Sequence, residues 1–173
     1  MQFEIESERL RVRRFIDGDA KFIVTLLNES SFIRFIGDKK VRTVEAARHY
    51  LMTGPIESYA RHGFGLYLVQ LKESNKPIGM CGLVKRDTLD DVDLGFAFLP
   101  EAWGKGYAFE AASAVLVHAR DALKLNRILA ITNPDNDASI KLLERLGFKF
   151  DRVVKLSNDA DEVKLFSLML DAS

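Results

Sequence analysis

The sequence is short of three things: cysteine, net charge and long apolar stretches. Its single cysteine among 173 residues excludes an internal disulfide. The 25 basic and 25 acidic residues cancel, which argues against nucleic-acid binding through a large positive field and leaves only a local basic patch open. No apolar run reaches the roughly 20 residues of a membrane-spanning helix, and the N-terminus Met1–Glu6 does not resemble a signal peptide. We therefore expect a cytoplasmic protein with no membrane partner and no direct nucleic-acid partner.

The cysteine and the histidines indicate no metal site. Cys81 lies in the apolar stretch Pro77–Val84, where a buried structural thiol is expected, and no neighbouring residue would activate it as a nucleophile. The histidines, His49, His62 and His118, are scattered, and none has a cysteine or a second histidine at metal-ligand spacing. We expect no bound metal.

Length and composition favour one domain covering residues 1–173. The hydrophobic fraction is 47%, which is ordinary for a globular protein. A chain of this size buries about 70% of its unfolded surface, so it needs neither a disulfide nor a metal to fold. The oligomeric state stays open between monomer and homodimer.

Apolar periodicity predicts a mixed α/β sheet. The predicted strands are 10–15, 64–71, 78–85, 92–99, 127–132, 148–155 and 163–170. The predicted helices are 17–28, 43–61, 105–123 and 137–146. Asp17 is the expected cap of the first helix, Gly54-Pro55 the expected break in the second, and Gly147 the expected end of the last. The long third helix is a crossover, which makes strands 92–99 and 127–132 parallel.

This crossover begins with a glycine loop, Pro100-Glu-Ala-Trp-Gly-Lys-Gly-Tyr-Ala108. Gly104 and Gly106 let the backbone bend and let a ligand approach the N–H groups closely. The first N–H groups of a helix lack internal partners and favour anions, and Lys105 adds a positive charge. The loop predicts a phosphate or pyrophosphate ligand, with a tight strand-to-helix turn as the equally weighted alternative. The spacing matches neither the P-loop nor the dinucleotide fingerprint.

A second motif follows the parallel strand: Asn133-Pro-Asp-Asn136-Asp-Ala-Ser139 opens a helix that ends in Leu-Gly-Phe148. The two motifs in this order resemble the GNAT superfamily of acetyltransferases. The segments Glu8–Arg14 and Trp103–Glu110 are similar to the branch that includes the RimJ and RimL ribosomal-protein N-terminal acetyltransferases. The resemblance covers nearly the whole chain. It implies an α/β (α+β) fold with a mixed, mostly antiparallel sheet of about seven strands, one parallel splayed pair, and helices on both faces.

The resemblance also implies acetyl-CoA as co-substrate. Its pyrophosphate is expected on the N–H groups of the glycine loop, and its pantetheine arm along the end of strand 92–99, with two asparagines bonding the arm from the other side. The implied donor-binding residues are Phe98, Leu99, Trp103, Gly104, Lys105, Gly106, Tyr107, Ala108, Asn133 and Asn136.

Two positions depart from the family pattern. Glu101 stands where the family often has Gln or Arg, and we expect a modest effect because the backbone does most of the phosphate binding. Leu143 stands where many relatives carry a tyrosine that protonates the departing thiolate. In the RimL-like branch a serine at the position of Ser139 is implied instead. The alternative is that Ser139 only caps its own helix.

The implied reaction is direct attack of an amine on the thioester. A backbone N–H near Phe98 or Leu99, where the family has a strand bulge, is expected to stabilise the carbonyl oxygen. Asp93 is the candidate base, because it shares a small strand face with Gly95 and Ala97 that leaves room for a substrate. The alternative is that Asp93 is simply solvated near a strand end.

The favoured acceptor is the N-terminal α-amine of a protein or peptide. An α-amine has a pKa of about 8 and is partly neutral at pH 7, whereas a lysine at about 10.4 is not. Two alternatives stay open: a small-molecule amine acetyltransferase with the same donor residues, and a module that binds acetyl-CoA without turnover. Acceptor specificity is expected from residues 17–62 and from the loop 158–161.

Overall fold

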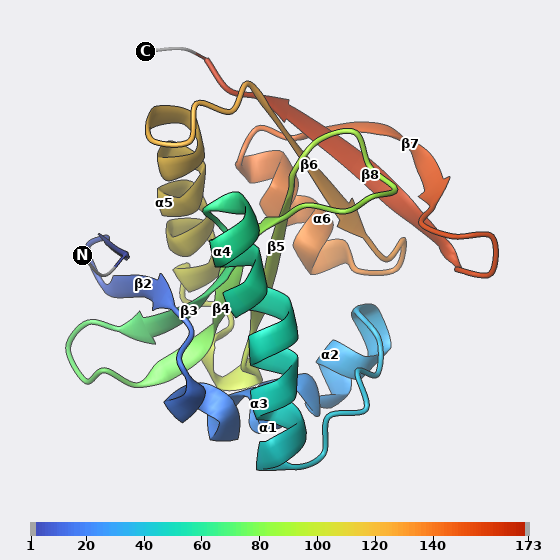
Figure 1. Ribbon diagram of the computed structural model, residues 1–173. Helices are drawn as coiled ribbons and strands as arrows, with labels where there is room; N and C mark the ends of the chain where they lie inside the picture. The colour runs from blue at the N-terminus through green and yellow to red at the C-terminus, as the bar shows by residue number, and fades with distance from the viewer. Residues whose placement is uncertain (1–2, 172–173) are drawn as a thin grey trace.

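A computed structural model describes residues 3–171 and has one eight-stranded sheet flanked by helices (Figure 1). The strands are β1 (Glu4–Glu6), β2 (Leu10–Arg14), β3 (Leu66–Leu71), β4 (Pro77–Val84), β5 (Asp93–Phe98), β6 (Arg127–Thr132), β7 (Lys149–Lys155) and β8 (Glu162–Met169). The helices are α1 (Ala20–Leu27), α2 (Ser30–Phe35), α3 (Val44–Leu51), α4 (Glu57–His62), α5 (Tyr107–Asp121) and α6 (Asp137–Arg145). None of the helices within residues 3–171 combines the length and the apolar character needed to span a membrane.

The strand order is β1-β2-β3-β4-β5-β6-β8-β7, and only β5 and β6 run parallel. The predicted mixed, mostly antiparallel sheet is confirmed, with eight strands in place of about seven. The additional strand is β1, which pairs with β2 from Glu4 opposite Arg13 to Glu6 opposite Arg11. Its three residues are too few to show a period of two.

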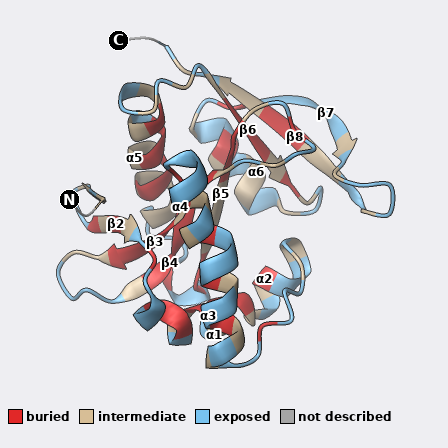
Figure 2. Ribbon diagram, viewed as in Figure 1, coloured by how far each residue is buried: buried red, intermediate tan, exposed pale blue. Residues whose placement is uncertain are grey.

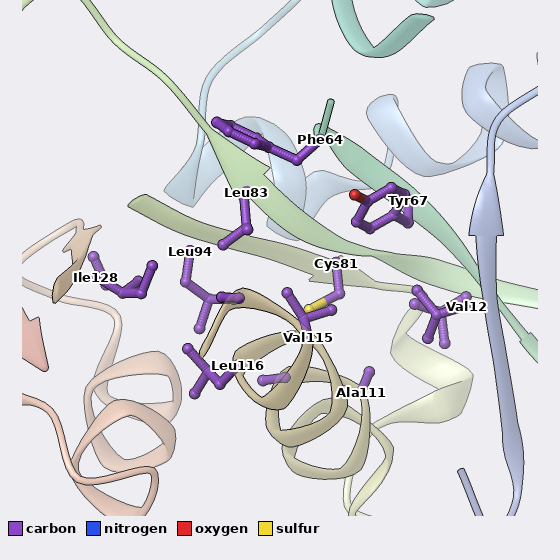
Figure 3. Packing of buried hydrophobic residues seen from close by; sticks show 14 of the residues in the cluster. Val12, Phe64, Tyr67, Cys81, Leu83, Leu94, Ala111, Val115, Leu116 and Ile128 are labelled. Carbon is purple, nitrogen blue, oxygen red and sulfur yellow. The ribbon is translucent and has the colours of Figure 1, made fainter. Parts of the chain in front are cut away.

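Helices cover both faces of the sheet, as expected. On one face, Cys81 and Leu94 point toward Val115 and Leu116 of α5 (Figure 3), within a core that also takes Leu143 from α6. On the other face, α1 and α3 pack against a second core. Figure 2 shows the consequence for α5, whose buried side faces the sheet and whose outer side is exposed.

The helical region before β3 differs from the prediction at three places. Residues 17–19 form a 3-10 turn, so the helix begins at Ala20, and Asp17 pairs with Arg48 at 3.1 Å instead of capping it. Gly54-Pro55 does not break the second helix. The chain widens there into a π-type turn, Met52–Ile56, that joins α3 to α4 and accommodates a proline without an N–H donor (Figure 1). Helix α2 was not predicted.

The elements that carry the sequence motifs follow the prediction closely. β5 leads through the 3-10 turn Pro100–Ala102 into α5, and β6 leads into α6. Gly147 has φ 98° and ends α6, with its N–H donating to the carbonyl of Glu144 at 3.0 Å. The glycine loop and the asparagine motif therefore both follow the carboxyl ends of the two parallel strands.

Candidate active site

The parallel strands β5 and β6 touch at one point and then separate. Their only registered pair is Asp93 with Leu129, supported by a 2.9 Å hydrogen bond from Leu129 N–H to the carbonyl of Val92. On its other side, β5 pairs with β4 along its whole length, from Asp93 to Phe98. Beyond Asp93, the side of β5 that faces β6 is therefore a strand edge that can pair with an extended ligand, except at the Phe98 carbonyl, which a tryptophan side chain already occupies.

The direction of the backbone groups on this edge follows from one hydrogen bond. The N–H of Leu99 donates to the carbonyl of Ile78 in β4 at 2.9 Å. Because bonding direction alternates along an antiparallel strand, the N–H groups of Phe96 and Phe98 point the other way, toward β6. Of the two N–H groups expected to face a carbonyl oxygen, that of Leu99 is used by β4, and that of Phe98 points into the gap between β5 and β6. The β4–β5 register is unbroken, so the expected bulge is absent from this pair.

The glycine loop adopts a backbone that glycine favours. Gly104 has φ 74° and Gly106 has φ 82°, both in the left-handed region. Gly106 is the N-cap of α5, and no side chain caps this helix end. The first N–H groups of α5 therefore remain available to an anion, unlike those of α6, which an asparagine caps.

The side chains of the glycine loop support its conformation. The Lys105 ammonium donates to the carbonyl of Glu101 at 3.1 Å, and the Glu101 carboxylate pairs with Lys76 at 3.1 Å. Trp103 is 53% exposed, and its indole N–H donates to the carbonyl of Phe98 at 3.0 Å. The indole thus ties the loop to the end of β5.

The asparagine motif forms the turn between β6 and α6. Asn133 Oδ1 accepts from the N–H of Asp135 at 2.9 Å, and Asn136 Oδ1 accepts from the N–H of Ser139 at 3.2 Å. Both side-chain amides use their oxygens inside the turn, which leaves their NH₂ groups as donors. Asn136, not Ser139, caps α6. Ser139 is partly buried in the first turn, so its hydroxyl is not consumed as the cap.

Leu143 is a core residue. Its side chain is fully buried in a core formed by residues of α5, the sheet and Phe148, which precedes β7. Many relatives have a tyrosine at this position. Here the leucine side chain is packed in the core, and it offers no acid to a leaving group.

Asp93 is buried, not solvated. Its side chain is 1% exposed, and Oδ1 accepts from Arg86 Nε at 3.1 Å. Burial raises the pKa of Asp93, and the charge of Arg86 opposes that rise. Gly95 on the same face is not open as expected, because Leu66 lies 3.2 Å from the position that a β-carbon would take.

The positive charge of Arg86 also acts on the pKa values of two further side chains, Lys39 and Tyr50. Burial lowers the pKa of Lys39, and the positive charge of Arg86 lowers it further. Burial raises the pKa of Tyr50, with Arg86 opposing the rise. Arg86, Lys39 and Tyr50 come from the β4–β5 connection, the α2–α3 connection and α3, so no local motif in the sequence identified them.

The cysteine and the histidines lie outside this region, in roles that need no chemistry. Cys81 is fully buried, and burial raises the pKa of its thiol to about 12. His49 and His62 are exposed, and His118 packs edge-on against Phe3. Among residues 3–171 there is no group of three or more His, Cys, Asp or Glu side chains that would hold a metal.

The match to a known family covers most of the chain. Residues 9–149 match the family model described as acetyltransferase (GNAT) domain. The uncharacterized N-acetyltransferase YoaA of Bacillus subtilis (strain 168) is 29% identical over 153 residues, which cover 87% of this chain and 85% of that protein.

Solved structures share the fold. The RimL ribosomal L7/L12 α-N-protein acetyltransferase in complex with coenzyme A has a TM-score of 0.85 and 19% identity, over 99% of this chain and 100% of the other. The acetyltransferase from Salmonella typhimurium that modifies the N-terminal serine of ribosomal protein L7/L12 has a TM-score of 0.82 and 18% identity, over 98% and 100% of the two chains.

Proposed function

The chain belongs to the GNAT acetyltransferase family, and from that premise we propose that it transfers the acetyl group of acetyl-CoA to the N-terminal α-amine of a protein or peptide. One observation carries the proposal. The splayed edge of β5 leads into an uncapped helix start at Gly106, and the facing strand β6 leads into an asparagine-capped helix that carries Ser139. The fold shared with RimL acetyltransferases supports the choice of acceptor.

The donor site is proposed from groups that the protein leaves unpaired. The N–H groups of residues 104–108 would hold the pyrophosphate, since no side chain caps this helix start. The β5 edge at Phe96 would pair with an amide of the pantetheine arm. The NH₂ groups of Asn133 and Asn136 would bond the arm from the β6 side. Acetyl-CoA supplies the activated acetyl group.

Two groups of this chain are proposed to stabilise the reaction. The Phe98 N–H would donate to the carbonyl oxygen as it gains charge, where a fixed dipole is most effective. The Ser139 hydroxyl would donate a hydrogen bond to the departing thiolate. A serine hydroxyl is a poor acid, but the thiol formed has a pKa of only about 8.5, so a hydrogen bond suffices and full proton transfer is not required.

Asp93 is proposed to accept the proton of the attacking amine through a chain of water molecules, because it lies at the opposite end of β5 from Phe98, roughly 16 Å along the extended strand. Burial raises the pKa of Asp93, which makes it a stronger base than an exposed carboxylate. Arg86 keeps the carboxylate charged by its 3.1 Å contact. An α-amine needs little help, because a useful fraction is already neutral at pH 7. A site with one weak base is therefore sufficient for an α-amine acceptor.

An acceptor screen tests the proposal. The purified protein is given acetyl-CoA with one of three acceptors: a lysine-free peptide that has a free N-terminus, a peptide with a blocked N-terminus in which one residue is replaced by lysine, or a polyamine. Release of coenzyme A thiol and the mass of the product are followed. We expect acetylation of the free N-terminus alone. Acetylation of the polyamine alone would overturn the acceptor, and no turnover combined with no binding of acetyl-CoA would overturn the donor as well.

A further inference from the structure

The first turn of α5 is bound to the turn between β1 and β2, about 100 residues away in the sequence. Glu110 Oε1 accepts from the Ser7 hydroxyl at 2.6 Å and from the Arg9 N–H at 2.7 Å, and Oε2 accepts from Arg9 Nε at 2.7 Å. Burial alone would raise the pKa of Glu110, but the hydrogen bonds from Ser7 and Arg9 together lower it. We call this group of Ser7, Arg9 and Glu110 the clasp.

The same arginine touches three consecutive residues of the glycine loop. Arg9 Nη1 donates to the carbonyl of Lys105 at 2.9 Å. Its Nη2 lies 3.3 Å from the position that a β-carbon on Gly106 would take. Its guanidinium lies 4.5 Å from the centre of the Tyr107 ring. Glu110 holds the guanidinium from one side, and the loop receives it on the other.

This contact fixes the direction of one N–H group. The peptide between Lys105 and Gly106 is planar and trans, so its carbonyl and its N–H point in opposite directions. Because the carbonyl of Lys105 is held toward Arg9, the N–H of Gly106 points away from Arg9. A phosphate held by this N–H at the start of α5 would therefore lie on the opposite side of the peptide from Arg9. Without the bond, the left-handed Gly106 that follows this peptide gives its plane more freedom to rotate.

The clasp also neutralises the negative charge of Glu110. Glu110 lies in the first turn of α5, where an unpaired carboxylate would repel a bound phosphate. Arg9 pairs with it, so the phosphate site faces a neutral pair and not a free negative charge. Both effects act on the phosphate end of the donor and neither acts on the acetyl end.

We infer that Arg9 is a positioning residue of the donor phosphate site, holding the Lys105–Gly106 peptide in the orientation that binds pyrophosphate while it neutralises Glu110. The inference rests on the proposed function, because it concerns the same site. It predicts that Arg9 matters only for donors that carry phosphate.

The test compares two donors, acetyl-CoA and S-acetylpantetheine, which lacks the pyrophosphate and the nucleotide. For Arg9→Ala we expect the KM for acetyl-CoA to rise about 10- to 150-fold, the range for losing a hydrogen bond to a charged group. We expect kcat with acetyl-CoA, and kcat/KM with S-acetylpantetheine, to stay within about twofold of wild type. Arg9→Lys should restore only part of the loss, since one ammonium does not replace a planar fork that bonds Glu110 and Lys105 at once.

Arg11→Ala is the matched control. Arg11 lies on the same chain segment and pairs with Glu4 at 3.0 Å and Glu6 at 3.2 Å, away from the loop. It should leave the KM for both donors unchanged. Glu110→Gln keeps the side-chain volume and provides a second variant if Arg9→Ala folds poorly, as judged by its melting temperature. It should also raise the KM for acetyl-CoA selectively.

The outcomes separate the inference from the proposed function. If Arg9→Ala and Glu110→Gln leave the KM for acetyl-CoA unchanged, or impair both donors equally, the inference is overturned and the clasp is only structural. If the wild-type protein itself uses S-acetylpantetheine as well as acetyl-CoA, the phosphate site fails and the proposed donor site fails with it.

Discussion

The separate roles of Asn136 and Ser139 give the sharpest test of how the mechanism stabilises the leaving thiolate. Asn136 Oδ1 caps α6 by accepting from the Ser139 N–H at 3.2 Å, and the Ser139 hydroxyl takes no part in the cap. Asn136→Ala should therefore cost about 1 kcal/mol of stability, within the 0.5–2 kcal/mol typical of an N-cap. In a chain of this size that lowers the melting temperature by about 2–4 °C.

Ser139→Ala should behave in the opposite way. It removes no cap and replaces serine by a good helix former, so the melting temperature should stay within about 1 °C of wild type. A hydrogen bond to a charged group is worth about 1.5–3 kcal/mol. Its loss at the leaving thiolate should lower kcat about 10- to 150-fold, with little change in the KM for acetyl-CoA.

The assay pairs thermal unfolding with steady-state release of coenzyme A thiol for both variants. Ser139→Cys is the conservative control, because a thiol retains a weak hydrogen-bond donor and should recover part of the rate. If Ser139→Ala melts as low as Asn136→Ala and keeps wild-type kcat, Ser139 is structural and the assignment of its hydroxyl to the leaving group is refuted.

Three further predictions concern buried side chains. Because the pKa of Asp93 is raised, kcat/KM should fall as the pH drops through that raised pKa and the carboxylate takes up its proton. Asp93→Asn should remove the contribution of Asp93 from a pH–rate profile and leave the one from the α-amine at about pH 8. Asp91→Asn, at a half-exposed ion pair with Arg127, should retain both. The Cys81 thiol, fully buried and with its pKa raised to about 12, should resist alkylation in the folded protein at pH 8, and rapid labelling without loss of structure would contradict its placement. Leu143→Tyr should not raise kcat and should cost about 1–3 kcal/mol by overpacking the core, as measured by denaturant unfolding; a faster enzyme of unchanged stability would show that the position opens to the site.

Strands and helices with a clear period were predictable from the sequence. The hairpin of β3 and β4, the crossover from β5 through α5 to β6, and the glycine end of α6 all occur where apolar periodicity and turn residues placed them. The failures have local causes. Pro55 would break an α-helix but fits a π-type turn, and β1 is too short for its pattern to be visible.

The candidate site also contains both residues that could be predicted from the sequence and residues that could not. The loop at Gly104 and Gly106 is contiguous in the sequence and could be found there. The partner of Asp93 could not be, because Arg86 lies across a turn with no pattern that pairs the two. The partner of Arg9 lies about 100 residues away, at Glu110, and only the folded sheet brings them together. Contacts of this kind depend on tertiary structure and not on local propensity.

The central claim is that the start of α5 holds the phosphates of acetyl-CoA, and a calorimetric binding measurement tests it most directly. Acetyl-CoA and dephospho-CoA are titrated into the wild-type protein and into Gly106→Glu, which places a side chain and a negative charge where φ is 82°. The account predicts that the wild type binds both ligands, since both carry the pyrophosphate, and that Gly106→Glu binds neither while remaining folded. A folded wild-type protein that binds neither ligand at millimolar concentration, or a Gly106→Glu variant that binds as tightly as wild type, would contradict it.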